Sequence, residues 1–441
     1  MRYWTFVATA VAVLAIGAQE FAAEAPSTTE PQDASAGAWA KDIGDRYLDA
    51  HVPDDSGGFV LVGSDQQVIG SDEDGWIVRV DANGNLTTQK RLGGPNGDAL
   101  HCITQTSDGG WIAGGWTESY GSQHWDGDGW ICKLDSTLKV QWQKRYRSTN
   151  KYRNERVLAI LASSDGGYLA LMFDESPYLM KLDSSGSVLW YKAYEIPTYG
   201  IGYVKSKLVQ LTDGGIAVLG GEPWYSFNRD GFLFKVNSDG NLLWNHWIAG
   251  RSSEDESEEL HALTATSDGG VVVGGYTTSY SDTGDGWLFK FDSGGNRLWE
   301  YRYKGSDSWL FTDAEELQDG SIILSGSYYS WAGDTRVVKV SSTGKLLWYK
   351  RYDMLDYWPE ISITSDGSFA MHNEEGDDVV KFSSTGDLTA ACKSTKWKLK
   401  TYKTTAAIYD PDITVTDQKM KKLNMNAKMY DTTETVTSNC H

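Results

Sequence analysis

Short runs of alternating apolar and polar residues, bounded by Gly, Asp, Asn and Ser, recur along most of the chain. In the most regular copy, the segments LHALTAT, SDGG, VVVGGYT, DGWLFKF, DSGGN and RLWEYRY follow one another between Leu260 and Tyr303. Runs of β-branched and aromatic residues with a period of two are typical of strands, and the glycine clusters between them are typical of tight turns. Each copy therefore predicts four antiparallel strands, with DGG joining the first two and a second tight turn joining the last two.

The DGG or DGS turn recurs about every fifty residues, which is the period of one β-propeller blade. Its aspartates are Asp108, Asp165, Asp213, Asp268, Asp319 and Asp366, and a degenerate copy begins at Ser56. Together these copies predict an all-β, seven-bladed β-propeller with four strands per blade.

A tryptophan follows the glycine of the second turn by four residues in several copies, and one large ring per repeat suits packing between blades. The last copy has no fourth strand of this kind. Trp39 to Ile43 stands alone before the first copy and resembles the segment from Trp348 to Asp353. We therefore expect this N-terminal strand to close the last blade and remove an exposed sheet edge.

The DGG, GDGW, WLFKFD, DxxGN and WxxxY set resembles the secreted bacterial and archaeal proteins built from this type of propeller repeat, many of them without an assigned function. The DxxGxxxW spacing is also similar to the tryptophan-docking motif of the quinoprotein dehydrogenases, and more distantly to kelch-type propellers. Those dehydrogenases hold a quinone and a metal, often beside two adjacent cysteines, whereas no two cysteines are adjacent here. The resemblance therefore implies the fold and the blade packing, and it does not carry over their active site.

The two ends of the chain differ from the repeats. Residues 1–23 combine one positive charge, a short apolar stretch and small residues, which is typical of a secretory signal peptide, and residues 24–37 form a polar, flexible leader. We assign residues 38–392 to the propeller and residues 393–441 to a β-rich extension, either an extra β layer on the propeller's side or a docking element. This organisation predicts a secreted protein, extracellular or, in a Gram-negative cell, periplasmic.

The formal net charge of −20 disfavours nucleic acids and anionic membrane surfaces as partners, because both carry charge of the same sign. No apolar run after the signal peptide is long enough to span a membrane. A carbohydrate or an extracellular protein fits this surface, and we expect a monomer.

The four cysteines divide into two pairs. Cys392 and Cys440 bracket the extension, and we predict a disulfide between them, worth ~4 kcal/mol in the chain-entropy model. Cys102 and Cys132 fall in strands at positions that other copies fill with small or apolar residues, so we expect two buried free thiols.

Aromatic residues gather in the loops from second to third strand and from one copy to the next, which share one face of a propeller. Flat rings beside polar groups suit sugars or peptides, although several rings could simply seal the blade junctions. The candidate ligand-binding residues are Trp116, Tyr120, Trp125, Trp224, Tyr225, Tyr276, Tyr280, Tyr328, Trp331 and Trp358.

Carboxylates recur just before the first strand of several copies, at Asp98, Glu155 and Glu258. Such a ring could bind Ca²⁺ at the channel mouth, and it could equally hold local turns; the structural role is the favoured interpretation. No other cofactor is indicated. His101 and His261 occupy equivalent repeat positions, which indicates structural roles, and we expect His372 in a loop.

The sequence contains no HExxH, GxSxG, phosphate-binding or dinucleotide-binding motif, and we assign no catalytic residue. The regular repeat therefore favours a non-enzymatic binding or scaffold protein with an aromatic, acidic loop face. Two alternatives stay open: a polysaccharide hydrolase or lyase that uses loop carboxylates, and a redox enzyme that holds a quinone.

Overall fold

The computed structural model describes most of the repeat region and little of the two ends. Main chain and side chains are described, with gaps at the loops, between residues 38 and 388, and beyond these only the backbone of six short strands. The predicted signal peptide and leader lie outside the described residues. The ranges are 38–42, 47–65, 73–119, 127–148, 155–174, 176–195, 206–221, 231–249, 257–280, 284–305, 308–328, 335–352, 358–373 and 378–388.

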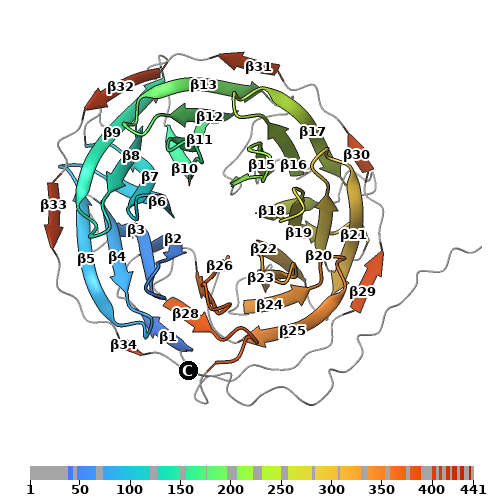
Figure 1. Cartoon of the computed structure of the whole chain (residues 1–441). Coiled ribbons are helices and arrows are strands. Elements are labelled where there is room, and N and C mark those ends of the chain that lie inside the picture. The colour runs from blue at the N-terminus through green and yellow to red at the C-terminus, as the bar shows by residue number, and fades with distance from the viewer. Residues whose placement is uncertain are drawn as a thin grey trace, which may run out of the picture.

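Seven antiparallel sheets stand around a central axis, so the predicted seven-bladed β-propeller is confirmed (Figure 1). The described residues contain no helix, and hence none that is long and apolar enough to cross a membrane. The strands are, for blade 1, β2 (Tyr47–Pro53), β3 (Phe59–Asp65), β4 (Asp74–Val80) and β5 (Leu86–Gly93); for blade 2, β6 (Asp98–Gln105), β7 (Trp111–Thr117), β8 (Asp128–Leu134) and β9 (Val140–Ser148); for blade 3, β10 (Arg156–Ala162), β11 (Tyr168–Asp174), β12 (Ser176–Leu182) and β13 (Val188–Glu195); for blade 4, β14 (Lys207–Gln210), β15 (Ile216–Gly221), β16 (Gly231–Val236) and β17 (Leu242–Ala249); for blade 5, β18 (Glu258–Ala265), β19 (Val271–Thr277), β20 (Asp285–Phe291) and β21 (Arg297–Lys304); for blade 6, β22 (Trp309–Glu316), β23 (Ile322–Tyr328), β24 (Thr335–Val340) and β25 (Leu346–Tyr352); and for blade 7, β26 (Glu360–Ile363), β27 (Phe369–His372) and β28 (Asp378–Phe382).

Blade 7 takes its fourth strand from the N-terminal side of the chain, as predicted. Strand β1 (Trp39–Asp42) pairs antiparallel with β28, and Trp39 lies opposite Lys381. The indole N–H of Trp39 donates to the carbonyl of Ala82 in blade 1, at 2.9 Å. This strand therefore completes one blade and contacts the next, which closes the ring.

Both predicted turns of each repeat are present on one face of the propeller. The second glycine-bearing turn has positive φ, as at Gly295 (84°), where a side chain would be strained. Blade 2 has Leu138 in place of this glycine, and Leu138 adopts the same conformation, with φ 63°. The turn geometry is thus kept even where the sequence lacks glycine, and the buried Leu138 side chain packs in the core.

The hydrophobic core is divided into seven clusters, each made by two adjacent blades. Aromatic residues of the outer strand extend this contact toward the next blade. Tyr303 donates to the Gly344 carbonyl at 2.6 Å, and Tyr194 donates to the Gly240 carbonyl at 2.7 Å. In blades 2, 3, 5 and 6 a tyrosine of the outer strand therefore contacts the next blade, as the WxxxY spacing indicates.

Aspartates at the start of the third strand are buried in ion pairs. Asp285 lies 2.8 Å from Arg302, and Asp128 lies 3.0 Å from Arg145 and 3.2 Å from Arg147. Both carboxylates are fully buried, so they need these cationic partners. Asp74 of blade 1 makes the same kind of pair with Arg91, at 2.8 Å, so this aspartate has a structural role in blades 1, 2 and 5.

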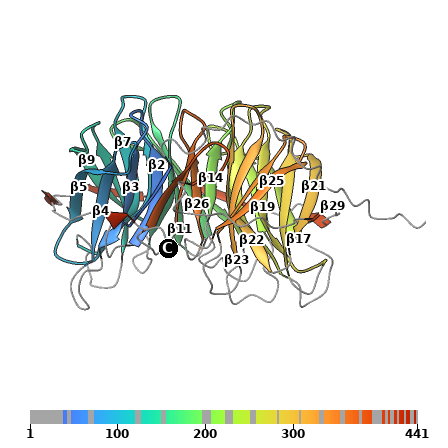
Figure 2. The same cartoon turned by 90° about the horizontal axis from the view of Figure 1, so that it is seen from below.

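The C-terminal extension runs around the outside of the propeller, as the extra β layer of the two predicted alternatives. Six short strands pair antiparallel with the outer strands of blades 5, 4, 3, 2, 1 and 7, in that order, opposite to the order in which the chain builds the blades (Figures 1 and 2). We call them the rim strands. They are β29 (Lys400–Lys403), β30 (Ala407–Tyr409), β31 (Thr414–Asp417), β32 (Met420–Asn424), β33 (Lys428–Asp431) and β34 (Thr437–Ser438).

Cys102 and Cys132 are buried free thiols, as predicted. Burial raises the pKa of the Cys132 thiol to about 12. Cys392 and Cys440 lie outside the described residues, so their disulfide stays a prediction; within the described part of the chain there is no disulfide.

Candidate functional site

The predicted loop-face aromatic residues are only partly described. Trp116, Tyr276 and Tyr280 pack against the blades: Tyr276 is 6% exposed, Arg156 lies over the Trp116 ring, and Arg302 lies over the Tyr280 ring. Tyr328 and Trp358 are partly exposed. Those outside the described residues are Tyr120, Trp125, Trp224, Tyr225 and Trp331.

The three candidate calcium ligands lie on different blades. Asp98 accepts hydrogen bonds from the Gly94 amide at 2.7 Å and the Ser119 hydroxyl at 2.6 Å, and burial raises its pKa. Glu258 accepts from Ser279 at 2.5 Å and from Thr277 at 3.1 Å, and Glu155 is buried. These contacts fit the structural role, since they tie the start of a blade's first strand to the end of its second strand and the loop that follows. Calcium binding stays a prediction.

A position in the innermost strand departs from the repeat in three blades. It is filled by Ala50, Cys102, Ala159 and Ala262 in blades 1, 2, 3 and 5, and by Lys207, Asp313 and Glu360 in blades 4, 6 and 7, as strand pairing shows. The three charged residues meet: the Lys207 ammonium lies 2.8 Å from Glu360 and 3.3 Å from Asp313. We call them the channel triad.

The channel triad joins blades that are not neighbours in the ring. Burial acts to lower the pKa of Lys207, but the carboxylates of Asp313 and Glu360 outweigh it and the pKa is raised, so the ammonium stays charged. Burial, and then the Asp313 carboxylate, raise the pKa of Glu315 to about 8. A charged bridge therefore spans the axis, with a carboxyl group beside it that is protonated at neutral pH.

Trp358 lies next to this bridge and has a strained backbone. Its φ is 40°, a conformation that a bulky residue seldom adopts, and Pro359 follows it. The Pro359 carbonyl accepts hydrogen bonds from Thr312 and Ser325, both at 2.6 Å. These two hydroxyls hold the strained segment in place.

The Trp358 ring reaches from the connection between blades 6 and 7 to blade 5. It meets His261 edge to face, with ring centroids 4.5 Å apart. His261 in turn lies 3.4 Å from the Glu259 carboxylate. We call Trp358, His261 and the channel triad together the channel-mouth site; Glu360 of the triad follows Trp358 by two residues.

A second polar group lies in the seam between blades 7 and 1. His51 is 2.7 Å from Ser362 and 2.7 Å from His372, and it occupies a position that is apolar in the other blades. Burial lowers the pKa of His51 to about 4. His372 is fully buried in β27, so its expected place in a loop is wrong; the alternation of FAMH continues the strand through it.

The sequence contained a signal for the channel triad. Cys102 aligns with Ala159 and Ala262 at one small, buried position, and extending this alignment places charged residues there in three other blades. Among the described residues, no group of three or more His, Cys, Asp or Glu side chains is arranged to hold a metal ion.

Known proteins resemble this chain over part or most of its length. Residues 178–366, less than half of the chain, match the PQQ_2 family model, described as outer membrane protein assembly factor BamB. No curated protein matches the chain. The family match agrees with the resemblance to quinoprotein-type propellers.

Solved structures are similar at low identity. A protein of unknown function from Dyadobacter fermentans DSM 18053 shares 12% identity, covers 78% of this chain and 98% of its own, and has a TM-score of 0.42. Sqt1 from Chaetomium thermophilum shares 12% identity over 83% of this chain and 89% of its own, with a TM-score of 0.46. PorZ, a surface component of the type-IX secretion system of Porphyromonas gingivalis, shares 13% identity over 79% of this chain and 48% of its own, with a TM-score of 0.47. None of these likenesses indicates a function for this chain.

Proposed function

We propose that the protein is an exported, non-enzymatic binding or scaffold protein that presents its channel-mouth site and loop face to a carbohydrate or an extracellular protein. The position of Trp358 carries this proposal. Trp358 has a partly exposed side chain and a backbone φ of 40°, a conformation that costs folding free energy. Such backbone strain is found mostly where a site is preorganised.

The surroundings of Trp358 fit a binding role. An aromatic ring next to a few fixed polar groups is the usual composition of a ligand site. Here His261 lies beside the ring, Glu259 lies beside His261, and Glu360 follows Trp358 in the chain by two residues. The carboxylates of Asp313 and Glu360 are neutralised by Lys207, which supports a role in holding the site rather than in proton transfer.

A comparison of wild type with Trp358→Ala tests this proposal. We expect wild-type protein to retain specific glycans on an array, or specific proteins from the medium of its own cells, and we expect Trp358→Ala to lose them. Leu298→Ala is the matched control, because Leu298 is 56% exposed on the outer strand β21. Equal retention by Trp358→Ala, or no retention by wild type, would count against the proposal.

A polysaccharide hydrolase or lyase is the second candidate, because Asp313, Glu315 and Glu360 converge on the innermost strands. A carboxyl group whose pKa is raised to about 8, as that of Glu315 is, could act as a general acid. A reducing-end assay on polysaccharides with wild type and Glu315→Gln separates the two candidates. Turnover by wild type that Glu315→Gln abolishes would replace the binding proposal with an enzymatic one.

A further inference from the structure

A pocket opens between blades 2 and 3 on the face of the tight turns, away from the channel-mouth site. Its volume is about 320 Å³, at the small end of the range for small-molecule sites. Trp142 of the outer strand β9 and Tyr168 of β11 form its aromatic walls, with ring centroids 5.8 Å apart and an interplanar angle of 61°. We call it the turn-face pocket.

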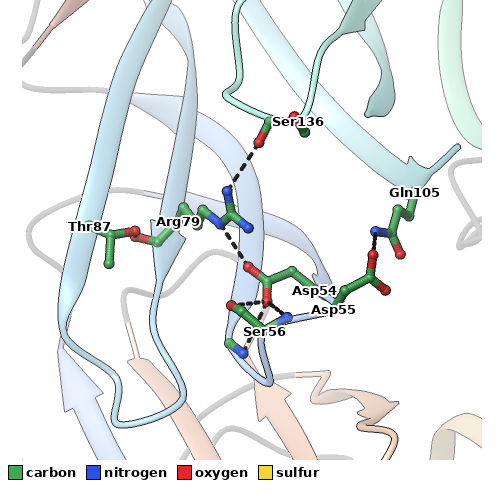
Figure 3. A network of polar contacts seen from close by, with 8 residues as sticks. Asp54, Asp55, Ser56, Arg79, Thr87, Gln105 and Ser136 are labelled. Atoms are coloured by element: carbon green, nitrogen blue, oxygen red, sulfur yellow. Dashed lines mark hydrogen bonds and ion pairs between the residues drawn. The ribbon is translucent and has the colours of Figure 1, made fainter. Parts of the chain in front are cut away.

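At four other blade interfaces the corresponding space is closed by a hydrogen bond to the carbonyl of the second residue of the next blade's turn. The indole N–H groups of Trp39, Trp244 and Trp299 donate to Ala82, Ser293 and Ser342, at 2.9, 3.1 and 3.0 Å. Between blades 1 and 2, where Thr88 holds the place of the tryptophan, Arg79 donates to Ser136 at 3.1 Å (Figure 3).

Trp142 is oriented differently. Its outer ring edge faces Gly186, and the Lys144 ammonium lies over the ring, 5.0 Å from its centroid. Neither the Trp142 N–H nor the Ser184 carbonyl, which holds the corresponding place in the turn, makes a hydrogen bond to a described residue. The contact that closes those four interfaces is therefore missing here, and the residues that would make it, Trp142 and Ser184, both line the pocket.

Tyr168 supplies a third open polar group. The residue is only 4% exposed, yet its hydroxyl makes no hydrogen bond within the described part of the chain. Burial, and then the nearby carboxylate of Asp108, raise the pKa of Tyr168, so the phenol keeps its proton at neutral pH. The hydroxyl itself is not sealed off by protein atoms, so it is free to pair with a ligand in the pocket.

The remaining charges of the pocket cancel. Lys133 is 2.9 Å from Asp108, and it also donates to the Leu134 carbonyl. Asp108 accepts from Thr106 as well, but its side chain is still 54% exposed and has room for another donor. A neutral, hydroxyl-rich ligand suits this pocket better than an anion, since Asp108 and Asp183 add negative potential around Tyr168.

The interface between blades 3 and 4 shows how the Trp142 and Tyr168 rings affect the size of the pocket. Between blades 3 and 4, Ile216 takes the place of Tyr168, and the corresponding pocket has a volume of about 20 Å³. Trp190 there has the same orientation as Trp142, with its outer ring edge toward Gly240 and Lys192 over the ring. The tryptophan orientation alone therefore does not make a pocket.

We propose that the turn-face pocket binds one residue of a neutral pyranose sugar. The aromatic walls would contact the apolar face of the ring, and the Trp142 N–H, the Tyr168 hydroxyl, the Ser184 carbonyl and the Asp108 carboxylate would pair with its hydroxyls. This site is separate from the loop face, so its presence does not depend on the proposed function.

Saturation-transfer NMR on the full chain tests the proposal. The probes are the methyl pyranosides of glucose, galactose, mannose and N-acetylglucosamine, with methyl glucuronide as an anionic probe. At least one neutral glycoside is expected to bind wild type more tightly than the glucuronide. Tyr168→Phe, which removes only the hydroxyl, should weaken that binding about fivefold, and Trp142→Ala should weaken it at least about tenfold.

Trp190→Ala is the matched control, since it removes the same kind of ring at the interface without a sizeable pocket, and it should leave sugar binding unchanged. If Trp142→Ala fails to fold, Tyr168→Phe alone decides. The proposal is wrong if no neutral glycoside binds wild type at about 20 mM, if Tyr168→Phe binds as wild type does, or if the glucuronide binds best.

Discussion

The Lys207 ammonium lies 2.8 Å from the Glu360 carboxylate although the two residues belong to blades 4 and 7, which blades 5 and 6 separate along the ring. With Asp313 of blade 6 at 3.3 Å, this contact joins sheets that share no strand pairing. A propeller is otherwise held by contacts between neighbours. The channel triad therefore couples distant blades directly.

Loss of the Lys207 charge should be costly. Lys207→Met leaves Asp313 and Glu360 without a cation in a confined space, and we expect the free energy of unfolding to fall by about 3 kcal/mol. Lys339→Met is the control, because its ion pair spans 3.4 Å and the Asp319 side chain is 61% exposed; it should cost less than about 1 kcal/mol. Guanidinium unfolding measures both, and equal costs would contradict a special role for the triad.

Stability should fall with acidification between pH 6.5 and 4 because of His51. Burial lowers the pKa of His51 from 6.5 to about 4, so in this window the unfolded chain binds more protons than the folded chain. The pKa difference corresponds to a loss of about 3 kcal/mol at pH 4.

Urea unfolding of wild type and His51→Gln across this window measures the effect. Glu315, whose pKa is raised to about 8, acts in the opposite direction, since its stabilising contribution is lost as pH rises toward 8. The difference between the two proteins isolates His51. Parallel pH profiles would show that His51 takes up its proton equally well in the folded state.

Substitution by alanine should destabilise the protein unequally at two glycines that have nearly the same φ. Gly320 (φ 76°) has no heavy atom within 4 Å of the place where a Cβ would lie, whereas at Gly344 (φ 77°) the Tyr301 ring would be 2.6 Å away. Gly320→Ala should cost about 1 kcal/mol from backbone strain alone. Gly344→Ala should cost clearly more, because it pushes the Tyr301 ring away from the blade 6 turn. Thermal unfolding compares them, and similar midpoints would show that the ring moves freely.

Thiol titration tests the predicted disulfide. Cys102 and Cys132 are buried, and burial raises the pKa values of both thiols, so neither should react in the native protein. Denatured, unreduced protein should show two reactive thiols if Cys392 and Cys440 are joined. Four reactive thiols under those conditions would rule the disulfide out.

Removal of the rim strands should expose sheet edges. A chain that ends after Leu388 would leave outer strands such as β21 and β17 without the rim strands that pair with them, and open edges favour association between molecules. We expect a lower unfolding midpoint and concentration-dependent oligomers in light scattering. A monomeric truncated protein with the wild-type midpoint would show that the rim strands contribute little.

The repeat made most of the fold predictable, because each blade depends on local signals. Gly295 and its equivalents indicate turns, and Tyr303 and its equivalents indicate contacts between neighbouring blades. Even the closing strand at Trp39 could be found, since the last repeat lacks a matching segment. Each of these features can be seen within a single repeat, or from the one strand that the last repeat lacks.

The channel triad is a different case, because Lys207, Asp313 and Glu360 are far apart in the sequence. Each departs from the small residue of the other repeats, but nothing within one repeat indicates that the three side chains meet. Only the ring brings them together. The turn-face pocket likewise depends on the orientation of the Trp142 ring, and Trp142 and Trp299 have the same place in the repeat. Periodicity cannot distinguish two orientations of one residue type.

Blade 7 has the strand order β26-β27-β28-β1-β34, so the first and the last described strands of the chain lie side by side in one sheet. During synthesis, β1 leaves the ribosome well before its neighbour β28 exists, and β34 follows only after the other rim strands. Blade 7, which closes the ring, can therefore form completely only after nearly the whole polypeptide has been synthesised. An N-terminal strand without its partners is open to wrong pairing for most of that time, so we expect its pairing with β28 to be a late step of folding.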